Sequence, residues 1–398
     1  MERDEGVLIA GAGPVGLITA LGLAQRGLAV TVVEAEPHII DSPRAMVYHW
    51  TVLEHLDRLG ILREAEEQGF RKQDYAYYVP ATGDWISFDL ELLAEDTDYP
   101  YNVHLGQHEL AAIALRHLEA IPGCQVLFDA RLTALTQDAT GVTATVQCKD
   151  GERELRAAWA LGADGARSAV RGLLGLEFAG FTWPERFVAT NVFYDFEAHG
   201  YARSVLQIDP VHGAIIAKID NRNLWRVTYS ESAELAEETV PDRLAENYAA
   251  LLPGDDAWEL DRITPYKMHQ RSAETYRVGR ALLAGDAAHA TNPTGGLGLT
   301  SGMFDSFALQ DALAAVAVDG ADDAILDEWA DERRRIFTEI ASPQASENKR
   351  LIYSEADPEQ RRKDVEALKA GVADRDLLRQ RLHFTRRLES QATAATRG

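Results

Sequence analysis

The chain has 398 residues, of which 46% are hydrophobic and 26% charged, a composition typical of a globular enzyme of about two domains. Its 40 basic and 63 acidic residues give a formal net charge of −23, which repels nucleic acid and anionic membranes, so any phosphate-bearing partner must be held by local groups. The two cysteines form no CxxC pair, and neither a secretory leader nor a membrane-length apolar run occurs, so we expect a cytoplasmic protein without a metal site or redox dithiol.

A strand, a helix and a second strand are predicted at the start of the chain. Residues 6–10 are a short apolar run, residues 17–25 have the composition of a helix, and residues 29–33 are again apolar and β-branched. Glycines fill the turn between the first strand and the helix. This order predicts a βαβ unit, on which dinucleotide-binding sites are built.

The turn of this unit reads GxGxxG, and an acid ends its second strand. Gly11 permits the tight turn, Gly13 lets a pyrophosphate approach the helix N-terminus, and Gly16 allows the helix to pack closely. Glu34 can accept a hydrogen bond from a ribose hydroxyl. Because an acid at this position repels a 2′-phosphate, the unit is predicted to bind FAD or NAD.

The centre of the chain is predicted to hold a helix, a small antiparallel meander and then a substrate-binding block. Helical spacing covers residues 107–121, and short strands follow at 125–128, 132–135 and 142–148. The later block has strand-like runs at 187–194, 214–217 and 224–229, with one helix at 241–252.

A Gly-Asp signature follows this block. An apolar strand leads into Gly285 and Asp286, which places a carboxylate where it can bind a polyol such as a ribityl chain. Glycines then open a helix over residues 299–316, whose N-terminus would face an anion such as reduced flavin. The alternative interpretation is an ordinary turn with a helix cap.

A third signature, Asp164-Gly165, lies between a strand and a helix for which Ser168 is the expected N-cap. Together, the three signatures in this order resemble the class A flavoprotein monooxygenases, the family of para-hydroxybenzoate hydroxylase and the phenol-type hydroxylases. The resemblance covers about residues 5–340. It implies an FAD enzyme that consumes NADPH or NADH and dioxygen, and hydroxylates a phenolic or hydroxylated (hetero)aromatic substrate through a C4a-hydroperoxyflavin. A monomer or homodimer is expected.

The resemblance implies an α/β fold with three parts. A Rossmann-like FAD-binding domain of the glutathione-reductase type is expected to comprise residues 1–75, 100–182 and 270–340. A β-sheet substrate domain, interleaved with it, is expected at 76–99 and 183–269. A C-terminal helical segment and tail would occupy residues 341–398.

The resemblance also assigns FAD contacts to individual residues. The candidates are Gly11, Gly13, Pro14, Val15, Gly16, Glu34, Ala35, Arg44, Ala45, Gln107, Leu132, Asp164, Asp286, Pro293, Gly296, Gly298, Leu299 and Thr300. The family often has Pro-Pro where this chain has Asn292-Pro293, and Asn where it has Thr300. Thr300 keeps its backbone N–H, so we expect the flavin contact to persist.

Three residues are candidates for work on the substrate. His49 follows the segment of Arg44 and could assist deprotonation. Arg226 and Tyr229 lie on one strand of the substrate block, but their odd separation puts them on opposite faces, so only one can point into a pocket. Two other functions remain open: a flavin-dependent reductase or dehydrogenase on the same fold, and a non-catalytic binding protein of that architecture.

Overall fold

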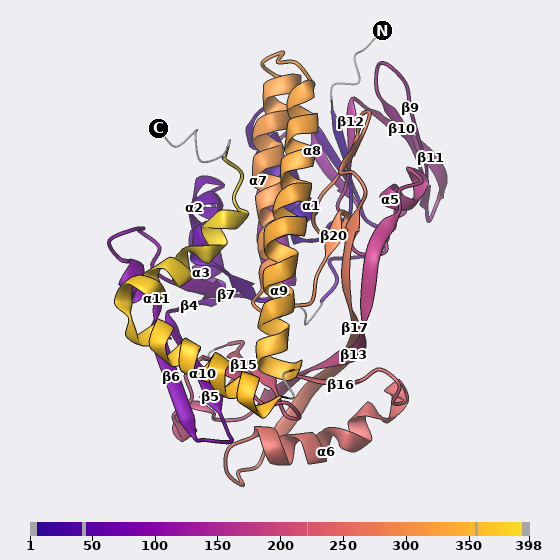
Figure 1. Ribbon diagram of the computed structural model, residues 1–398. Helices are drawn as coiled ribbons and strands as arrows, with labels where there is room; N and C mark the ends of the chain where they lie inside the picture. Colours follow the sequence, from indigo (N-terminus) through magenta and orange to yellow (C-terminus); the bar gives the residue numbers. More distant parts are fainter. Residues whose placement is uncertain (1–5, 42–44, 221, 355–356, 392–398) are drawn as a thin grey trace.

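The computed structural model describes residues 6–41, 45–220, 222–354 and 357–391. Its first layer is a six-stranded sheet in the order β18-β19-β12-β1-β2-β8, parallel except for β18 (Figure 1). The strands are β1 (Val7–Ala10), β2 (Val30–Val33), β8 (Cys124–Leu127), β12 (Trp159–Gly162), β18 (Arg277–Val278) and β19 (Ala281–Leu283). The predicted α/β fold class is confirmed.

Helix α1 (Pro14–Gln25) is apolar around most of its circumference because it is enclosed between other helices. Nine of its 12 residues are buried, and it packs against both α4 (Gln107–Glu119) and α7 (Leu297–Ala317). Pro14 starts the helix at a position where its missing N–H costs nothing. The helix therefore holds the glycine-rich turn rigidly against the sheet.

The predicted meander needs one correction. The three-stranded antiparallel sheet consists of β9 (Arg131–Gln137), β10 (Val142–Cys148) and β11 (Gly151–Ala157). The strand expected at 125–128 does not join it, because β8 pairs in parallel with β2, with Cys124 opposite Val30. The preceding helix α4 supplies the crossover that a parallel strand requires.

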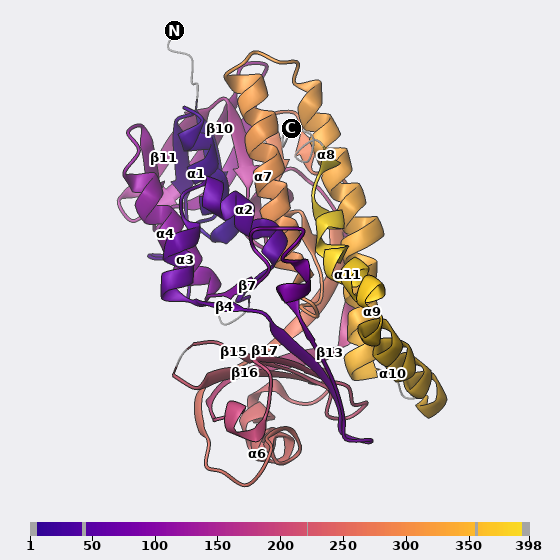
Figure 2. The same ribbon diagram turned by 90° about the vertical axis from the view of Figure 1, so that its left-hand side faces the viewer.

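The second layer is an eight-stranded sheet in the order β20-β17-β13-β16-β15-β14-β5-β6. Its strands are β5 (Asp74–Val79), β6 (Asp84–Asp89), β13 (Phe178–Phe193), β14 (Ser204–Gln207), β15 (Ala214–Lys218), β16 (Leu224–Ser232), β17 (Glu259–Ala273) and β20 (His289–Ala290). Helix α6 (Val240–Leu251) covers one face, and the six-stranded first layer, where the cofactor is expected (the cofactor layer), lies on the other side of the sheet (Figure 2). The long strands β13 and β17 run between the two layers (Figure 1).

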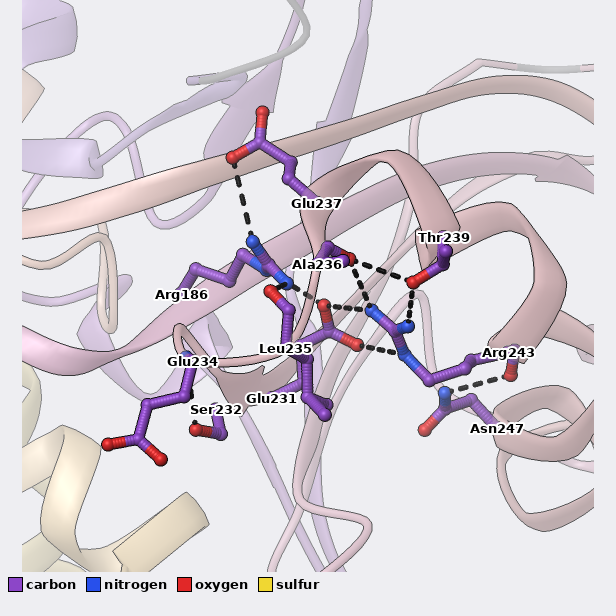
Figure 3. Close-up of polar contacts among 10 residues, drawn as sticks. All are labelled: Arg186, Glu231, Ser232, Glu234, Leu235, Ala236, Glu237, Thr239, Arg243 and Asn247. Carbon is purple, nitrogen blue, oxygen red and sulfur yellow. Dashed lines mark hydrogen bonds and ion pairs between the residues drawn. The ribbon is translucent and has the colours of Figure 1, made fainter.

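A buried ion cluster fixes the loop that leads into α6 (Figure 3). Glu231 Oε1 accepts hydrogen bonds from Arg186 Nε at 2.8 Å and from Arg243 Nη2 at 2.9 Å. Arg186 is only 2% exposed and also donates to the backbone carbonyl of Leu235. The carboxylate between two guanidinium groups thus fastens β13, β16 and α6 to one another.

A small sheet and the C-terminal helices connect the two layers. Sheet β3-β7-β4 contains β3 (Val47–Tyr48), β7 (Asn102–His104) and β4 (Phe70–Lys72), next to α2 (Trp50–Arg58) and α3 (Leu62–Gln68). Beyond α5 (Ala169–Leu173) and α7, the chain forms α8 (Ala324–Ile336), α9 (Ser342–Lys349), α10 (Pro358–Ala373) and α11 (Arg375–Leu382). Within the described ranges, no helix is long and apolar enough to span a membrane. The division into domains stays a prediction.

Candidate active site

The glycine-rich turn is shaped by close backbone contacts at two glycines and by open space at the third. Gly11 has φ +106°, and a Cβ there would lie 2.4 Å from Ala163 O. A Cβ on Gly16 would lie 2.0 Å from Gly11 O. A Cβ on Gly13 would meet nothing within 4 Å. The N-terminus of α1 therefore faces a space that a pyrophosphate group could occupy.

Glu34 lies at the end of β2 and faces this turn. Its Oε2 accepts from the N–H of Ala12 at 2.8 Å, and its Oε1 from the N–H of Glu36 at 3.0 Å. Each carboxylate oxygen keeps a second lone pair for a ribose hydroxyl. Ala35 is half-buried beside it, and Leu132 is buried in the core at the start of β9.

Asp164 lies directly beneath the glycine-rich turn. Its Oδ2 accepts from the N–H groups of Ala169 and Val170 at 2.7 and 3.2 Å, and Ser168 caps the same helix through the N–H of Arg171, as predicted. Its Oδ1 is buried and has no hydrogen-bond partner among the described residues. Burial raises the pKa of this carboxyl. The unpartnered oxygen fits a donor group supplied by a ligand.

The Gly-Asp signature meets the first signature at Val15. A Cβ on Gly285 would lie 3.0 Å from the Val15 side chain, and a Cβ on Gly302 would lie 2.9 Å from it. Asp286 is exposed although its neighbours Gly285 and Ala287 are buried. Its side chain is thus accessible at this turn, where the ribityl chain is expected.

The N-terminus of α7 could hold an anion. Gly295 and Gly296 have φ values of +92° and +68°, which turn the chain into the helix. The first N–H groups of a helix have no intrahelical partner and carry its positive dipole end, and here they include those of Gly298 and Leu299. Pro293 O accepts from the N–H of Gly296 at 3.0 Å and closes the preceding turn.

The structure brings His49 to this helix end. Thr300 Oγ1 donates to Gly296 O at 3.0 Å, so His49 Nδ1, at 2.8 Å from Thr300 Oγ1, is the donor in their contact. A Cβ on Gly296 would lie 3.1 Å from His49 Cε1. Burial and the charge of Lys72 lower the pKa of His49 to about 4, so its ring is neutral near pH 7. Its catalytic role stays a prediction.

Two weaker candidates lie side by side. The backbone N–H of Gln107 donates to Ala45 O at 3.2 Å, which places the start of α4 beside the segment before β3. Arg44, the remaining candidate in that segment, lies outside the described residues.

Arg226 and Tyr229 lie on opposite faces of β16, as their spacing predicts. Arg226 is 8% exposed, and its Nε donates to Asn191 Oδ1 at 3.2 Å. Burial lowers its pKa to about 10. Tyr229 is buried in the hydrophobic core beneath α6, on the face that is turned away from the cofactor layer. Of the two, only Arg226 can therefore face a substrate between the layers.

A buried charge network under the Gly-Asp turn was not predicted from the sequence. Asp305 Oδ2 accepts from the N–H of Gly285 at 2.9 Å and from His289 Nε2 at 2.6 Å, and Asp305 Oδ1 accepts from Arg333 Nε at 2.8 Å. Asp305, His289 and Arg333 are all 0% exposed. The available signal was an acid inside an apolar helix, which requires a buried partner.

Two further side chains, neither of them predicted from the sequence, hold the loop before α7. Gln270 Oε1 accepts from the backbone N–H and from Nδ2 of Asn292, at 3.2 and 3.3 Å. Asn348 Nδ2 donates to Thr294 O at 3.4 Å. Strand β17 and helix α9 thus both position this loop.

The comparisons with known proteins agree with this geometry. A family model described as "FAD binding domain" matches residues 4–343. The chain is 42% identical to 6-hydroxy-3-succinoylpyridine 3-monooxygenase HspB of Pseudomonas putida (strain DSM 28022 / S16), covering 98% of this chain and 100% of that protein. It is 43% identical to para-nitrophenol 4-monooxygenase of Pseudomonas sp. (strain WBC-3), covering 96% and 95%.

A solved structure matches along nearly the same length. The crystal structure of p-nitrophenol 4-monooxygenase PnpA from Pseudomonas putida DLL-E4 superposes with a TM-score of 0.94 at 42% identity, covering 98% of this chain and 100% of that one. The glycine-rich turn, the unpartnered oxygen of Asp164 and the free end of α7 fit FAD. The chain therefore belongs to the FAD-binding family of flavin-dependent aromatic monooxygenases.

Proposed function

We propose that this monooxygenase oxygenates a ring carbon that lies para to a hydroxyl group and already carries a substituent. The names of the two relatives support this assignment, because both locate the reaction at such a carbon. In p-nitrophenol, C4 carries the nitro group, and in 6-hydroxy-3-succinoylpyridine, C3 carries the succinoyl group. Both positions are para to the ring hydroxyl. The proposed substrate class is therefore para-substituted phenols and hydroxypyridines.

The residues around the cofactor site suit this chemistry. FAD, when bound, accepts a hydride from NAD(P)H and activates dioxygen. Gly11, Gly13 and Glu34 would hold its ADP half, and Asp286 its ribityl chain. The N-terminus of α7 would stabilise negative charge on the pyrimidine side of the flavin. Loss of the hydroxyl proton makes the para carbon electron-rich, so the chain must also place a proton acceptor near the ring.

The experiment uses FAD-loaded protein, NADH or NADPH, and p-nitrophenol, with p-nitroanisole as the control that has no hydroxyl proton. We expect p-nitrophenol to stimulate NAD(P)H oxidation, with about one nitrite released for each dioxygen consumed. p-Nitroanisole should stimulate neither NAD(P)H oxidation nor nitrite release. A reductase on this fold would oxidise NAD(P)H without incorporating oxygen, and a binding protein would do neither. Absence of any stimulation by para-substituted phenols would reject the proposed function.

We also propose a position for the nicotinamide dinucleotide. Arg167, Lys267, His269 and Arg271 form a basic cluster beside the Asp164 loop and on β17, and no carboxylate pairs with any of them among the described residues. Burial and the charges of Arg271, Lys267 and Arg167 lower the pKa of His269. In a chain of net charge −23, such an unpaired cluster suits the diphosphate of NAD(P)H.

Arg271→Ala should raise the KM for NAD(P)H by roughly tenfold, because one charge-assisted contact to phosphate is removed. The kcat and the affinity for FAD should change little. Steady-state kinetics at two salt concentrations provide the measurement, since the wild-type KM should also rise with salt. Arg63→Ala is the control, because Arg63 lies on α3 with an 87% exposed side chain. An unchanged KM in the Arg271 variant would place the dinucleotide elsewhere.

A further inference from the structure

A lysine is buried where the small sheet meets the eight-stranded sheet. Lys72 ends β4 and is 0% exposed. Its Nζ lies over the ring of Tyr75 and has no hydrogen-bond partner among the described residues. A buried lysine normally pairs with a carboxylate, because burial of an isolated ammonium costs several kcal/mol. This amine therefore lacks the group that would make its burial favourable.

Two polar side chains share its face of the sheet. Strands β4 and β7 pair Lys72 with Asn102 and Phe70 with His104, so these side chains project to the same side. His104 Nδ1 donates to Lys218 O at 2.9 Å, which leaves Nε2 as a hydrogen-bond acceptor. That Nε2 is also buried and has no partner among the residues with described positions.

The two carboxylates that act electrostatically on Lys72 accept hydrogen bonds from other groups. Asp74 accepts from the backbone N–H and from Nε of Arg203 at 2.6 and 2.8 Å. Asp89 accepts from the N–H of Glu91 at 2.6 Å. Burial lowers the pKa of Lys72 well below its usual value, with the charge of Arg203 acting in the same direction and those of Asp74 and Asp89 opposing it.

Two histidines lie within electrostatic range of the lysine. Burial, together with a protonated Lys72, lowers the pKa of His49, which contacts Thr300 at the N-terminus of α7. Lys72 also contributes, after burial, to the lowering of the pKa of His104 to about 3. Lys72 is thus coupled to two imidazoles, one at the N-terminus of α7 and one that donates to Lys218 O of the eight-stranded sheet.

We propose that the Nζ amine of Lys72 is the base that accepts the proton of the substrate's ring hydroxyl, and that the resulting ammonium then holds the phenolate oxygen. The O–H bond breaks, its electron pair stays on oxygen, and an N–H bond forms on Nζ. The transfer leaves the net charge of the site unchanged and gives each buried charge its partner. This inference rests on the proposed function for its substrate class.

The test reads the ionisation of bound p-nitrophenol directly, from the visible absorption of nitrophenolate, in oxidised FAD-loaded enzyme without NAD(P)H. In wild type, the pKa of bound p-nitrophenol should lie at least one unit below the pKa of the free ligand, which is a tenfold change in its acid dissociation constant. In Lys72→Met, that shift should disappear. Lys363→Met, in the exposed salt bridge of Lys363 with Glu359, is the matched control.

Lys72→Arg provides a second variant, because arginine keeps a positive charge but cannot accept a proton. The kcat/KM of this variant should follow the ionisation of free p-nitrophenol. One pH unit below the pKa of the free ligand, kcat/KM should be about tenfold lower than its value at high pH. A wild-type shift that persists in the Met variant, or an Arg variant with the wild-type pH profile, would overturn the assignment. The absorption measurement needs no turnover, so it remains informative if NAD(P)H oxidation is not stimulated and the proposed function itself fails.

Discussion

Gly13→Ala should weaken FAD binding by roughly 100-fold, which corresponds to about 2.7 kcal/mol, while leaving the folded apoprotein intact. The new methyl group would project into the open space at the N-terminus of α1, where no described residue other than its chain neighbours lies within 4 Å. Backbone conformation offers no obstacle, because Gly13 has φ −76°. Since the methyl group would displace none of the described residues, it should act on a bound pyrophosphate. Flavin fluorescence titration of the apoprotein gives the dissociation constant, and thermal unfolding of the same sample gives the stability.

Gly371→Ala is the matched control. Gly371 lies in α10, and a Cβ there would also meet nothing within 4 Å. This substitution should leave FAD affinity unchanged and raise helix stability slightly. Gly11→Ala should behave differently from both, since its Cβ would clash with Ala163 O and destabilise the apoprotein itself. Normal FAD affinity in the Gly13 variant would show that the pyrophosphate does not lie over this turn.

The cofactor site could be predicted from the sequence because its signals are local. The glycine-rich turn, Glu34, the Asp164 loop and the Gly-Asp turn each combine a strand end with residues that suit a phosphate, a ribose or a polyol. Each signal depends on fewer than about 25 consecutive residues. Such patterns do not show that these segments lie together in the fold. In the structure they meet at Val15 and Ala163.

The parts that were missed depend on pairings across the sheet or between distant helices. Strand β8 was assigned to the meander, because sequence does not show whether a short strand pairs with its neighbour or with β2. Lys72 resembles any lysine at the end of a short strand, and only the pairing of β4 with β7 buries it. The spacing of Arg226 and Tyr229 did predict their opposite faces, but not which face would meet α6.

Asp305→Asn should lower the free energy of unfolding by about 3–5 kcal/mol and release bound FAD, because it leaves the guanidinium of Arg333 buried beside a neutral group. The carboxylate joins the Gly-Asp turn, α7 and α8 through Gly285 N and Arg333 Nε. Loss of its charge should therefore loosen the turn that carries Asp286. Urea unfolding of FAD-loaded and apo samples provides the measurement. Asp311→Asn, on the same helix but in a surface pair with Arg26, should cost at most about 0.5 kcal/mol.

The same network predicts how the free energy of unfolding depends on pH. The charges of His289 and Arg333 outweigh the effect of burial and lower the pKa of Asp305 to about 2. An unfolded aspartate titrates near 3.9, so the contribution of Asp305 is fully present above about pH 4 and is lost as the pH falls towards 2. This contribution should be about 2–3 kcal/mol in wild type and absent in Asp305→Asn. Urea midpoints measured between pH 5 and 3 should therefore fall more steeply for wild type than for the variant, and parallel curves would contradict a charged Asp305 in the native protein.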